Sequence, residues 1–309
     1  MRIVTYGTKG AERAGIFLER GIVDLANALA SAGAVPTTDT RTFLEQDGWR
    51  STLDRAASAA KSLPVIDPKS VRLGPPVAFP RKLMIAGANT YSHLKEAEPL
   101  LGKVEPPSQP MVLGKATSAI CGPYDEMILP PETKKLDYEV ELGVVIGRTA
   151  HRIREADVRN YVAGFMTTND VSARDVQLAE YESNSFYRVH YLGKSFDTFA
   201  PTGPALVTPD EFTWGAPFKL LTKVNGEIRQ SSDTSDLIYS IEALIAYVSR
   251  HMTLFPGDIF QTGSPAGVAF FMRPPRFVQP GDIVRCEIYG IGAIENVVHA
   301  ESGAPGGNR

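Results

Sequence analysis

Three acidic residues recur at every second position in one stretch of the chain: Asp137, Glu139 and Glu141. Apolar residues alternate with them from residue 136 onwards, and this period of two predicts a half-buried strand with the acids on one face. The two glutamates would lie roughly 7 Å apart and would repel each other unless a positive charge lay between them. Because Mg²⁺ and Ca²⁺ bind carboxylate oxygens, the spacing points to a divalent-metal site.

The ordinary alternative for this pattern is a solvated strand face whose acids pair with lysines on the next strand. A metal site also needs a third acid, and Asp170 is the candidate because it follows an apolar strand-like run. If a helix runs from about Asn169 to Ala179, then Asp170, Arg174 and Gln177 share one helix face. Alternatively, Asp170 or Asn169 only caps that helix and Asp170 pairs with Arg174.

The composition is that of a water-soluble enzyme or binding protein. The 309 residues include 32 basic and 35 acidic side chains and no basic run, so neither a nucleic acid nor a membrane surface is an expected partner. The two cysteines, Cys121 and Cys286, are too few and too far apart for a disulfide framework and fit a reducing compartment. Without an apolar signal segment or an 18-residue apolar run, the expected location is the cytoplasm.

The elements that must position these residues are mostly short strands between Gly- and Pro-rich turns, with few helices. This pattern predicts an α+β fold with a rolled or sandwiched sheet. We expect a small N-terminal α+β domain over residues 1–72, a Pro-rich connector over 73–80 and the main domain over 81–305, because prolines at this density oppose helices and central strands. The expected strands of the main domain are 82–86, 140–146, 219–224, 258–262 and 283–289, and a helix is expected over 235–248.

Over roughly residues 81–300 the chain resembles the fumarylacetoacetate hydrolase family. Six ordered segments carry the resemblance, including a G-x-N-Y-x-x-H-x-x-E-like motif, a D-Y-E-x-E-L motif and an N-D-x-[ST]-x-R-D motif; they lie at 85–96, 137–142, 169–175, 193–199, 224–227 and 262–268. The resemblance implies the mixed β-sandwich roll of that family and a homodimer formed through the main domain. It also implies that Glu139, Glu141 and Asp170 bind one Mg²⁺ or Mn²⁺, with Ca²⁺ as a further candidate. Three carboxylates leave about three positions of a six-coordinate ion for substrate oxygens and water.

The same resemblance implies roles for seven further residues. His93 and Glu96 would form the pair that activates a water molecule, because their i, i+3 spacing brings them together in a helix and a carboxylate raises the basicity of a histidine. Lys194 would stabilise the negative charge of an enolate. The substrate would be held by Arg174, Gln177, Thr198 and Ser264. The other four histidines match no family motif and are interpreted as structural or surface residues.

The activity that the resemblance favours is hydrolytic C–C cleavage of an acylpyruvate or a similar 1,3-dioxo acid, a reaction of aromatic-compound catabolism. The same site would serve an oxaloacetate decarboxylase, a hydroxymuconate-type isomerase or a hydratase. A protein that binds a diacid without converting it is the third alternative. Three departures from the family pattern weaken any assignment of the substrate: Lys115 is followed by alanine rather than proline, Ser264 replaces a threonine, and residues 291–296 replace a G-T-L-x-N pattern. The segment 96–110 contains four prolines and is predicted to be a mobile lid.

Overall fold

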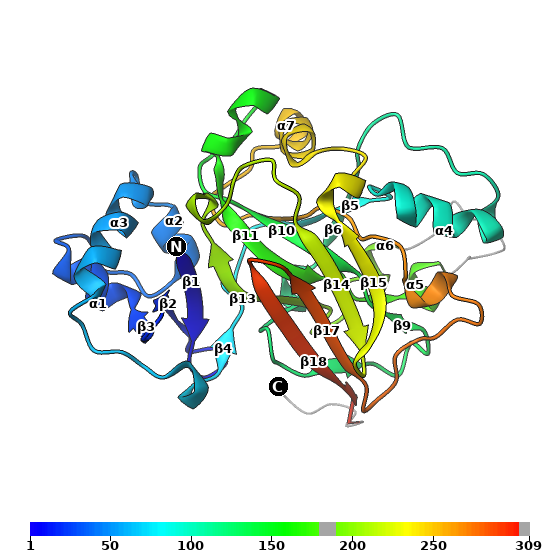
Figure 1. Ribbon diagram of the computed structural model, residues 1–309, viewed down its shortest axis with the longest axis horizontal. Coiled ribbons are helices and arrows are strands. Elements are labelled where there is room, and N and C mark those ends of the chain that lie inside the picture. Colours follow the sequence, from blue (N-terminus) through cyan, green and yellow to red (C-terminus); the bar gives the residue numbers. More distant parts are fainter. Residues whose placement is uncertain (179–189, 303–309) are drawn as a thin grey trace.

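The protein is described by a computed structural model that covers residues 1–178 and 190–302 (Figure 1). Its larger sheet has the strand order β3-β2-β1-β13-β11-β10-β16-β5-β6, with β4 and β7 added on β1 and β13. These strands are β1 (Arg2–Tyr6), β2 (Arg13–Leu18), β3 (Gly21–Asp24), β4 (Leu73–Gly74), β5 (Leu83–Gly87), β6 (Met111–Lys115), β7 (Ile120–Cys121), β10 (Val140–Ile146), β11 (Val162–Asn169), β13 (Ala200–Val207) and β16 (Ile259–Gln261).

A second sheet packs against the first and closes the core between them. Its order is β15-β14-β17-β18-β8, formed by β8 (Met127–Leu129), β14 (Lys219–Val224), β15 (Glu227–Asp233), β17 (Ile283–Ile288) and β18 (Gly292–Ala300). Figure 1 shows this sheet in front of β10, β11 and β13. A third pair, β9 (Leu136–Asp137) with β12 (Ser172–Ala173), lies beside them. The predicted α+β fold with a mixed β-sandwich roll is therefore confirmed, and all five expected strands of the main unit are present.

Strand β10 lies in the middle of the larger sheet, hydrogen-bonded to β11 on one side and β16 on the other. All seven of its residues are buried. The strand predicted to be half-buried is therefore buried along its whole length. The alternative of a solvated acidic face is wrong, because Glu141 in β10 and Glu139 just before it are both buried. Buried carboxylates require compensation by cations or hydrogen bonds, so burial strengthens the case for a specific site.

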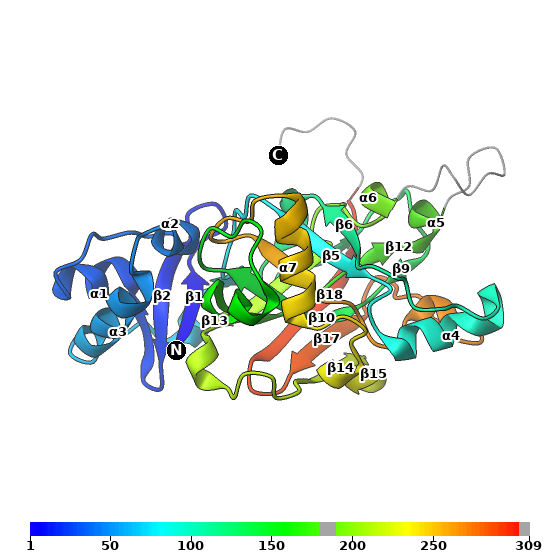
Figure 2. The same ribbon diagram turned by 90° about the horizontal axis from the view of Figure 1, so that it is seen from above.

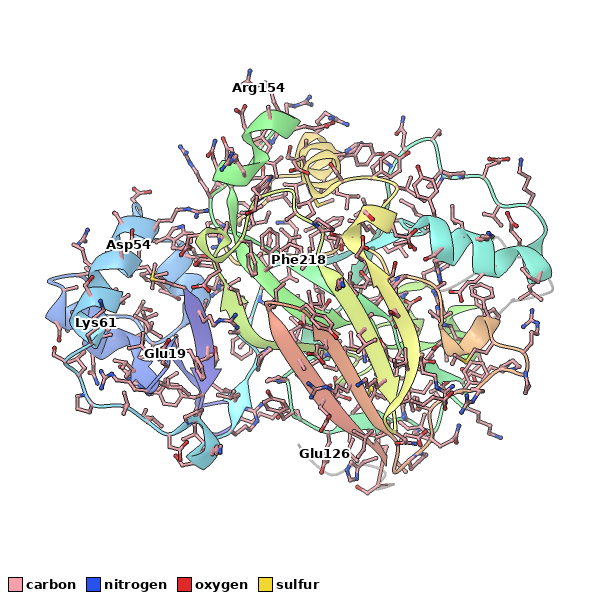
Figure 3. The ribbon with its side chains drawn as sticks, viewed as in Figure 1. Glu19, Asp54, Lys61, Glu126, Arg154 and Phe218 are labelled. Atoms are coloured by element: carbon pink, nitrogen blue, oxygen red, sulfur yellow. The ribbon has the colours of Figure 1, made fainter. Side chains whose placement is uncertain are left out.

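Seven helices lie outside the sheets in the described residues: α1 (Leu25–Ser31), α2 (Thr40–Leu44), α3 (Trp49–Ala60), α4 (Tyr91–Leu101), α5 (Arg174–Gln177), α6 (His190–Gly193) and α7 (Ile241–His251). Helices α1 to α3 surround β1 and β2 at one end of the molecule, and α4 lies at the other end (Figure 2). The exposed charged residues labelled in Figure 3, such as Asp54, Lys61 and Arg154, lie around the margin. No helix of residues 1–178 and 190–302 is long and apolar enough to cross a membrane.

The two helix predictions of the main unit are only partly correct. Residues up to Asn169 continue strand β11, and the helix begins five residues later, at Arg174, because the antiparallel partner β10 extends the strand. The helix expected over 235–248 runs from Ile241 to His251, since Ser240 caps it through a hydrogen bond from the Ala243 N–H.

The N-terminal unit shares a sheet with the rest of the chain. Strand β1 pairs with β13, with Arg2 opposite Val207, and the side chain of Trp49 donates a hydrogen bond of 2.8 Å to the Gly147 carbonyl at the end of β10. The predicted division of the chain at residues 73–80 stays a prediction. What the structure adds is that the two sides are hydrogen-bonded through one continuous sheet.

Candidate metal centre and active site

The pairing of β10 with β11 brings the three candidate metal ligands together. Val140 lies opposite Asn169 in this antiparallel pair. Glu139 precedes Val140 and Asp170 follows Asn169, so Glu139 and Asp170 are neighbours. The Asp170 N–H donates to the Glu139 carbonyl at 2.8 Å, and the Asn169 side chain accepts from the Glu139 N–H at 2.9 Å. One carboxylate oxygen each from Glu139, Glu141 and Asp170 lies within 4.8 Å of the others, and all three residues are buried.

The helix that was expected to present Asp170 does not exist at that position. Asp170 lies in the link between β11 and β12, four residues before α5. The predicted convergence with Arg174 and Gln177 occurs nevertheless, because the chain turns back through β12 before α5 begins.

Glu139 is held as a carboxylate by the basic residues around it. Its two oxygens accept hydrogen bonds from Arg174 Nη2 and Lys194 Nζ, each at 2.8 Å. Burial alone would raise the pKa of Glu139, but the charges of Arg174 and Lys194 outweigh burial and hold the pKa well below its ordinary value.

Two lysines contact Asp170. Lys115 Nζ lies 2.6 Å from Oδ1, and Lys194 Nζ donates to Oδ2. Lys194 also donates to Glu139 and, at 2.9 Å, to the Ser172 hydroxyl, so the site itself uses all three of its N–H groups. Burial lowers the pKa of Lys115, whereas the attraction of Asp170 and Glu139 outweighs burial and raises the pKa of Lys194.

Glu141 is the exception within this cluster. It accepts a hydrogen bond of 2.6 Å from the Gly263 N–H, but within the described residues no basic side chain forms an ion pair with it. Burial, followed by the charges of Asp170 and Glu139, raises its pKa well above the ordinary value. A divalent cation bound by the three carboxylates would supply the missing positive charge, so the donor set fits a hard metal ion.

His93 and Glu96 meet on α4 as their spacing predicts. Thr90 caps the helix, and His93 Nδ1 lies 2.7 Å from Glu96 Oε1. In a neutral His93 ring that donates its Nδ1–H to the Glu96 carboxylate, Nε2 would be the unprotonated nitrogen. Nε2 lies 3.9 Å from Glu139 Oε1, so this nitrogen faces the acidic cluster.

Arg174 is enclosed by acceptors. Its guanidinium donates to Asp137 Oδ2 at 2.9 Å, to Glu139 Oε1 at 2.8 Å and to Gln177 Oε1 at 2.9 Å. Burial would lower the pKa of Arg174, but Glu139 and Asp137 outweigh it and raise the pKa. Among the described residues, Nη1 and Nη2 each have one such acceptor, and the role of Arg174 in binding a substrate carboxylate stays a prediction.

The last two predicted substrate-binding residues differ in their placement. Ser264 lines the cavity described below and accepts a hydrogen bond of 2.8 Å from Gln230. Thr198 does not line it: its hydroxyl accepts a hydrogen bond of 2.8 Å from the Ile128 N–H. The structure therefore does not bring Thr198 together with the other predicted residues.

A cavity of about 420 Å³ joins these groups. The acidic cluster, His93, Arg174 and Lys194 line one part of it. The rest is lined by apolar side chains from α4, β5, β6 and the turn at Ala269–Phe271, where Phe271 packs edge-on against His93 at 5.6 Å between ring centroids. This combination of an apolar pocket with a few converging polar groups is typical of small-molecule sites.

Sequence reasoning missed several members of the site. Lys115 was noted only as a departure from the family pattern, although its place at the end of the alternating run Met111, Leu113, Lys115 was a signal for a strand face shared with the cavity. His190 was assigned to structural histidines, yet it lines the cavity. Nothing in the local sequence marked Phe271. The predicted lid is helix α4 as far as residue 101, and beyond it the Gln109 side chain is tied to Tyr247 by a hydrogen bond of 3.0 Å.

Comparison with known proteins supports an enzyme site. The sequence model described as "Fumarylacetoacetate (FAA) hydrolase C-terminal" matches residues 82–299. Oxaloacetate tautomerase Fahd2a, mitochondrial, of Rattus norvegicus is 43% identical over 302 residues, which are 96% of this chain and 91% of that protein. Fumarylacetoacetate hydrolase from Exiguobacterium antarcticum superposes with a TM-score of 0.76 at 30% identity, covering 97% and 100% of the two chains. Maleylpyruvate hydrolase from Sphingobium sp. SYK-6, solved with manganese(II) and pyruvate, gives 0.75 at 26% identity, covering 98% and 100%.

Proposed function

Because the chain belongs to the fumarylacetoacetate hydrolase family, whose compared members are enzymes, we propose that it catalyses the interconversion of the enol and keto forms of oxaloacetate with a divalent metal ion. The observation that carries this proposal is the base His93, fixed by Glu96 at 2.7 Å, with its free nitrogen turned towards three buried carboxylates. Support also comes from the 43%-identical relative named as an oxaloacetate tautomerase. Mg²⁺ and Mn²⁺ both suit an all-carboxylate donor set, and manganese in the maleylpyruvate hydrolase structure supports the latter.

Tautomerisation needs one proton removed and one delivered, with the negative charge stabilised between the two steps. When bound, the divalent cation would polarise the 2-oxo group and stabilise the enolate charge. Arg174 would orient a carboxylate of the substrate through its remaining N–H groups. His93 Nε2 would take the proton from the enol hydroxyl and return one to the carbon, while Glu96 holds the ring and stabilises its protonated form. The apolar walls would keep bulk water away from the charged intermediate.

The loss of enol absorbance after enol-oxaloacetate is added to the metal-loaded protein tests this proposal. Since general acid–base catalysis contributes about 10²–10⁴-fold, His93→Asn should slow the enzymatic rate by roughly that factor, and Glu96→Gln by less. His151→Asn is the matched control, because His151 is exposed and lines no part of the cavity. A His93→Asn protein that tautomerises oxaloacetate at the parent rate would disprove the assigned role.

Hydrolytic C–C cleavage of an acylpyruvate is the second candidate, and the volume of the cavity favours it. In that reaction His93 would take a proton from the attacking water, and the pyruvate enolate would be the leaving group. Pyruvate release from acetylpyruvate, followed with lactate dehydrogenase, distinguishes the two reactions. Cleavage faster than oxaloacetate tautomerisation would reverse their order. We also propose that the protein is a homodimer formed through the main domain, as the family resemblance implies.

A further inference from the structure

The cavity is much larger than the head group that the acidic cluster would bind. Its volume of about 420 Å³ lies within the range of pockets that hold drug-sized ligands, whereas oxaloacetate has only four carbons. A four-carbon acid bound at the cluster would leave most of this volume unfilled. The chemistry of the unfilled part is therefore informative about what else the site binds.

Helix α4 gives one measure of how far the unfilled part extends. His93 lies at the polar end, and Leu94, Ala97 and Leu100 follow at helical spacing as cavity-lining residues. Since an α-helix rises 1.5 Å per residue, the apolar wall continues for roughly 10 Å beyond His93. Leu100 is half exposed, so this wall reaches the cavity mouth.

Strand β6 gives a second, independent measure. Alternate residues of a strand share a face, so Met111, Leu113 and Lys115 project to the same side of β6. Lys115 reaches Asp170 at the polar end, whereas Leu113 and Met111 line the cavity. Four residues of strand separate Lys115 from Met111, which corresponds to roughly 13 Å. Two elements thus lead away from the cluster over a similar distance, and both present only apolar side chains on the way.

The charges of the cavity are confined to one end. Among lining residues in the described ranges, the charged side chains are Glu139, Glu141, Asp170, Arg174 and Lys194, and these contact one another. No lysine or arginine of the described lining lies along the α4 and β6 walls. Along the α4 and β6 walls of the described lining, a second carboxylate would lose water without gaining a lysine or arginine partner, which is unfavourable.

We propose that this cavity accepts 2-oxo acids bearing an uncharged, apolar tail of roughly six carbons, which lies between α4 and β6 along the roughly 10 Å of apolar wall. The proposal rests on the proposed function only for the head group, which the metal-bound end would hold. Met111 is the residue that sets the apolar character of the mouth, because it is 41% exposed there and stands at the far end of the β6 face.

Binding of unreactive oxamates to the Mn²⁺-loaded protein, measured by calorimetry, tests the proposal without requiring turnover. The probes are N-methyl, N-hexyl and N-(5-carboxypentyl) oxamate. Full burial of one methylene improves binding about four-fold. N-hexyl oxamate has five more methylenes than N-methyl oxamate, so even about two-fold for each would make it bind about thirty-fold more tightly. The carboxypentyl compound, of nearly the same length, should bind at least about ten-fold more weakly than the hexyl compound.

A charge introduced at the mouth should change this order. Met111→Arg should weaken N-hexyl oxamate and strengthen the carboxypentyl compound, whereas Met252→Arg should leave both unchanged. Met252 is a matched control because it is the same residue type, 40% exposed, and outside the cavity lining. If Met111→Arg fails to fold, Met111→Gln supplies a neutral polar variant that should weaken only the hexyl compound.

Equal binding of the methyl and hexyl compounds, or a carboxypentyl compound as tight as the hexyl one, would overturn the proposal. Hexyl binding that responds to Met111→Arg in a protein that does not tautomerise oxaloacetate would support the apolar subsite and count against the proposed reaction. If neither compound binds, both proposals fall.

Discussion

Glu141 is the carboxylate of the cluster that lacks a basic partner. Glu139 and Asp170 each contact lysine or arginine, but Glu141 is opposed only by the Gly263 N–H. Its raised pKa reflects burial and the two neighbouring negative charges. Without a bound cation the buried carboxylate of Glu141 destabilises the folded protein, whereas with a cation it acts as a ligand. Replacement of Glu141 should therefore not destabilise the metal-free protein, but it should weaken the stabilisation by metal.

We expect Glu141→Gln to leave the metal-free protein as stable as the parent or more stable, because one repelled charge is removed. Mn²⁺ at a hundred times its dissociation constant should stabilise the parent by about 2.7 kcal/mol, and the variant by much less at the same concentration. Thermal unfolding with and without Mn²⁺ measures both effects. Glu19→Gln is the control, because Glu19 is an exposed acid of the N-terminal unit. An equal Mn²⁺-induced rise in Tm for parent and Glu141→Gln would contradict the ligand assignment.

At the scale of elements, the carboxylate of Asp24 joins β3 to three others, β1, β2 and α1. Asp24 ends β3, and its Oδ2 accepts hydrogen bonds of 2.7 Å from Tyr6 on β1 and from Arg13 on β2. Its Oδ1 accepts from the Asn27 N–H at 3.0 Å and so caps α1. Burial would raise the pKa of Asp24, but the hydrogen bonds from Arg13, Tyr6 and Asn27 outweigh burial and lower it.

Asp24→Asn should therefore destabilise the protein by about 1–3 kcal/mol at pH 7, since it removes charge-assisted hydrogen bonds. A lowered carboxyl pKa contributes stability that is present above the unfolded value, about 3.9, and is lost as the pH falls through the folded value. The difference in unfolding free energy between parent and variant should thus be largest at neutral pH and shrink below about pH 4. Urea unfolding at several pH values measures it, and a difference that grows with acidity would contradict this account.

The strands of the sheets were predicted better than the segment around Asp170, which links β11 to β12. Val140–Ile146 and Lys219–Val224 match their predicted bounds because β-branched and apolar residues recur there and no proline interrupts pairing. The site around Asp170 was misassigned because Asn169–Asp170 reads locally as a helix cap, while the pairing partner that extends β11 lies 30 residues away in the chain. Local propensity cannot report such a partner.

The metal cluster, in contrast, was predictable, because the spacing of its glutamates is local in the sequence. Its glutamates lie two residues apart in the sequence, Glu141 in β10 and Glu139 immediately before it, and the family motifs supplied the aspartate. The Phe271 ring enters the site only through tertiary packing. The alternating run that ends at Lys115 predicts a strand face but does not show that this face meets the carboxylates.

At the scale of the whole molecule, the larger sheet runs from the N-terminal unit through β13, β11 and β10 to β5 and β6 beside the cavity. Removal of residues 1–80 would leave β13 without β1 and would uncover buried Leu206 and Val207 beside an unpaired strand edge. Exposed apolar strand edges pair with other chains.

Residues 81–309 expressed alone should therefore aggregate, although they contain every residue of the metal cluster. Co-expression with residues 1–80 should restore soluble protein if the two pieces pair through β1 and β13. Solubility and chain mass by size-exclusion chromatography with light scattering measure both outcomes. A soluble, folded 81–309 fragment would show instead that the connector at 73–80 separates independent domains.

The shared face of β6 also bears on how this protein could diverge. Lys115 and Met111 lie on one strand face with Leu113 between them; Met111 lines the cavity mouth, and Lys115 contacts Asp170 at the polar end. Because each is fixed by the same backbone pairing with β5, a mutation at position 111 leaves the position of the lysine unaltered. Duplicated copies of the gene could thus acquire new preferences by single changes at the pocket rim while inheriting the reaction centre intact.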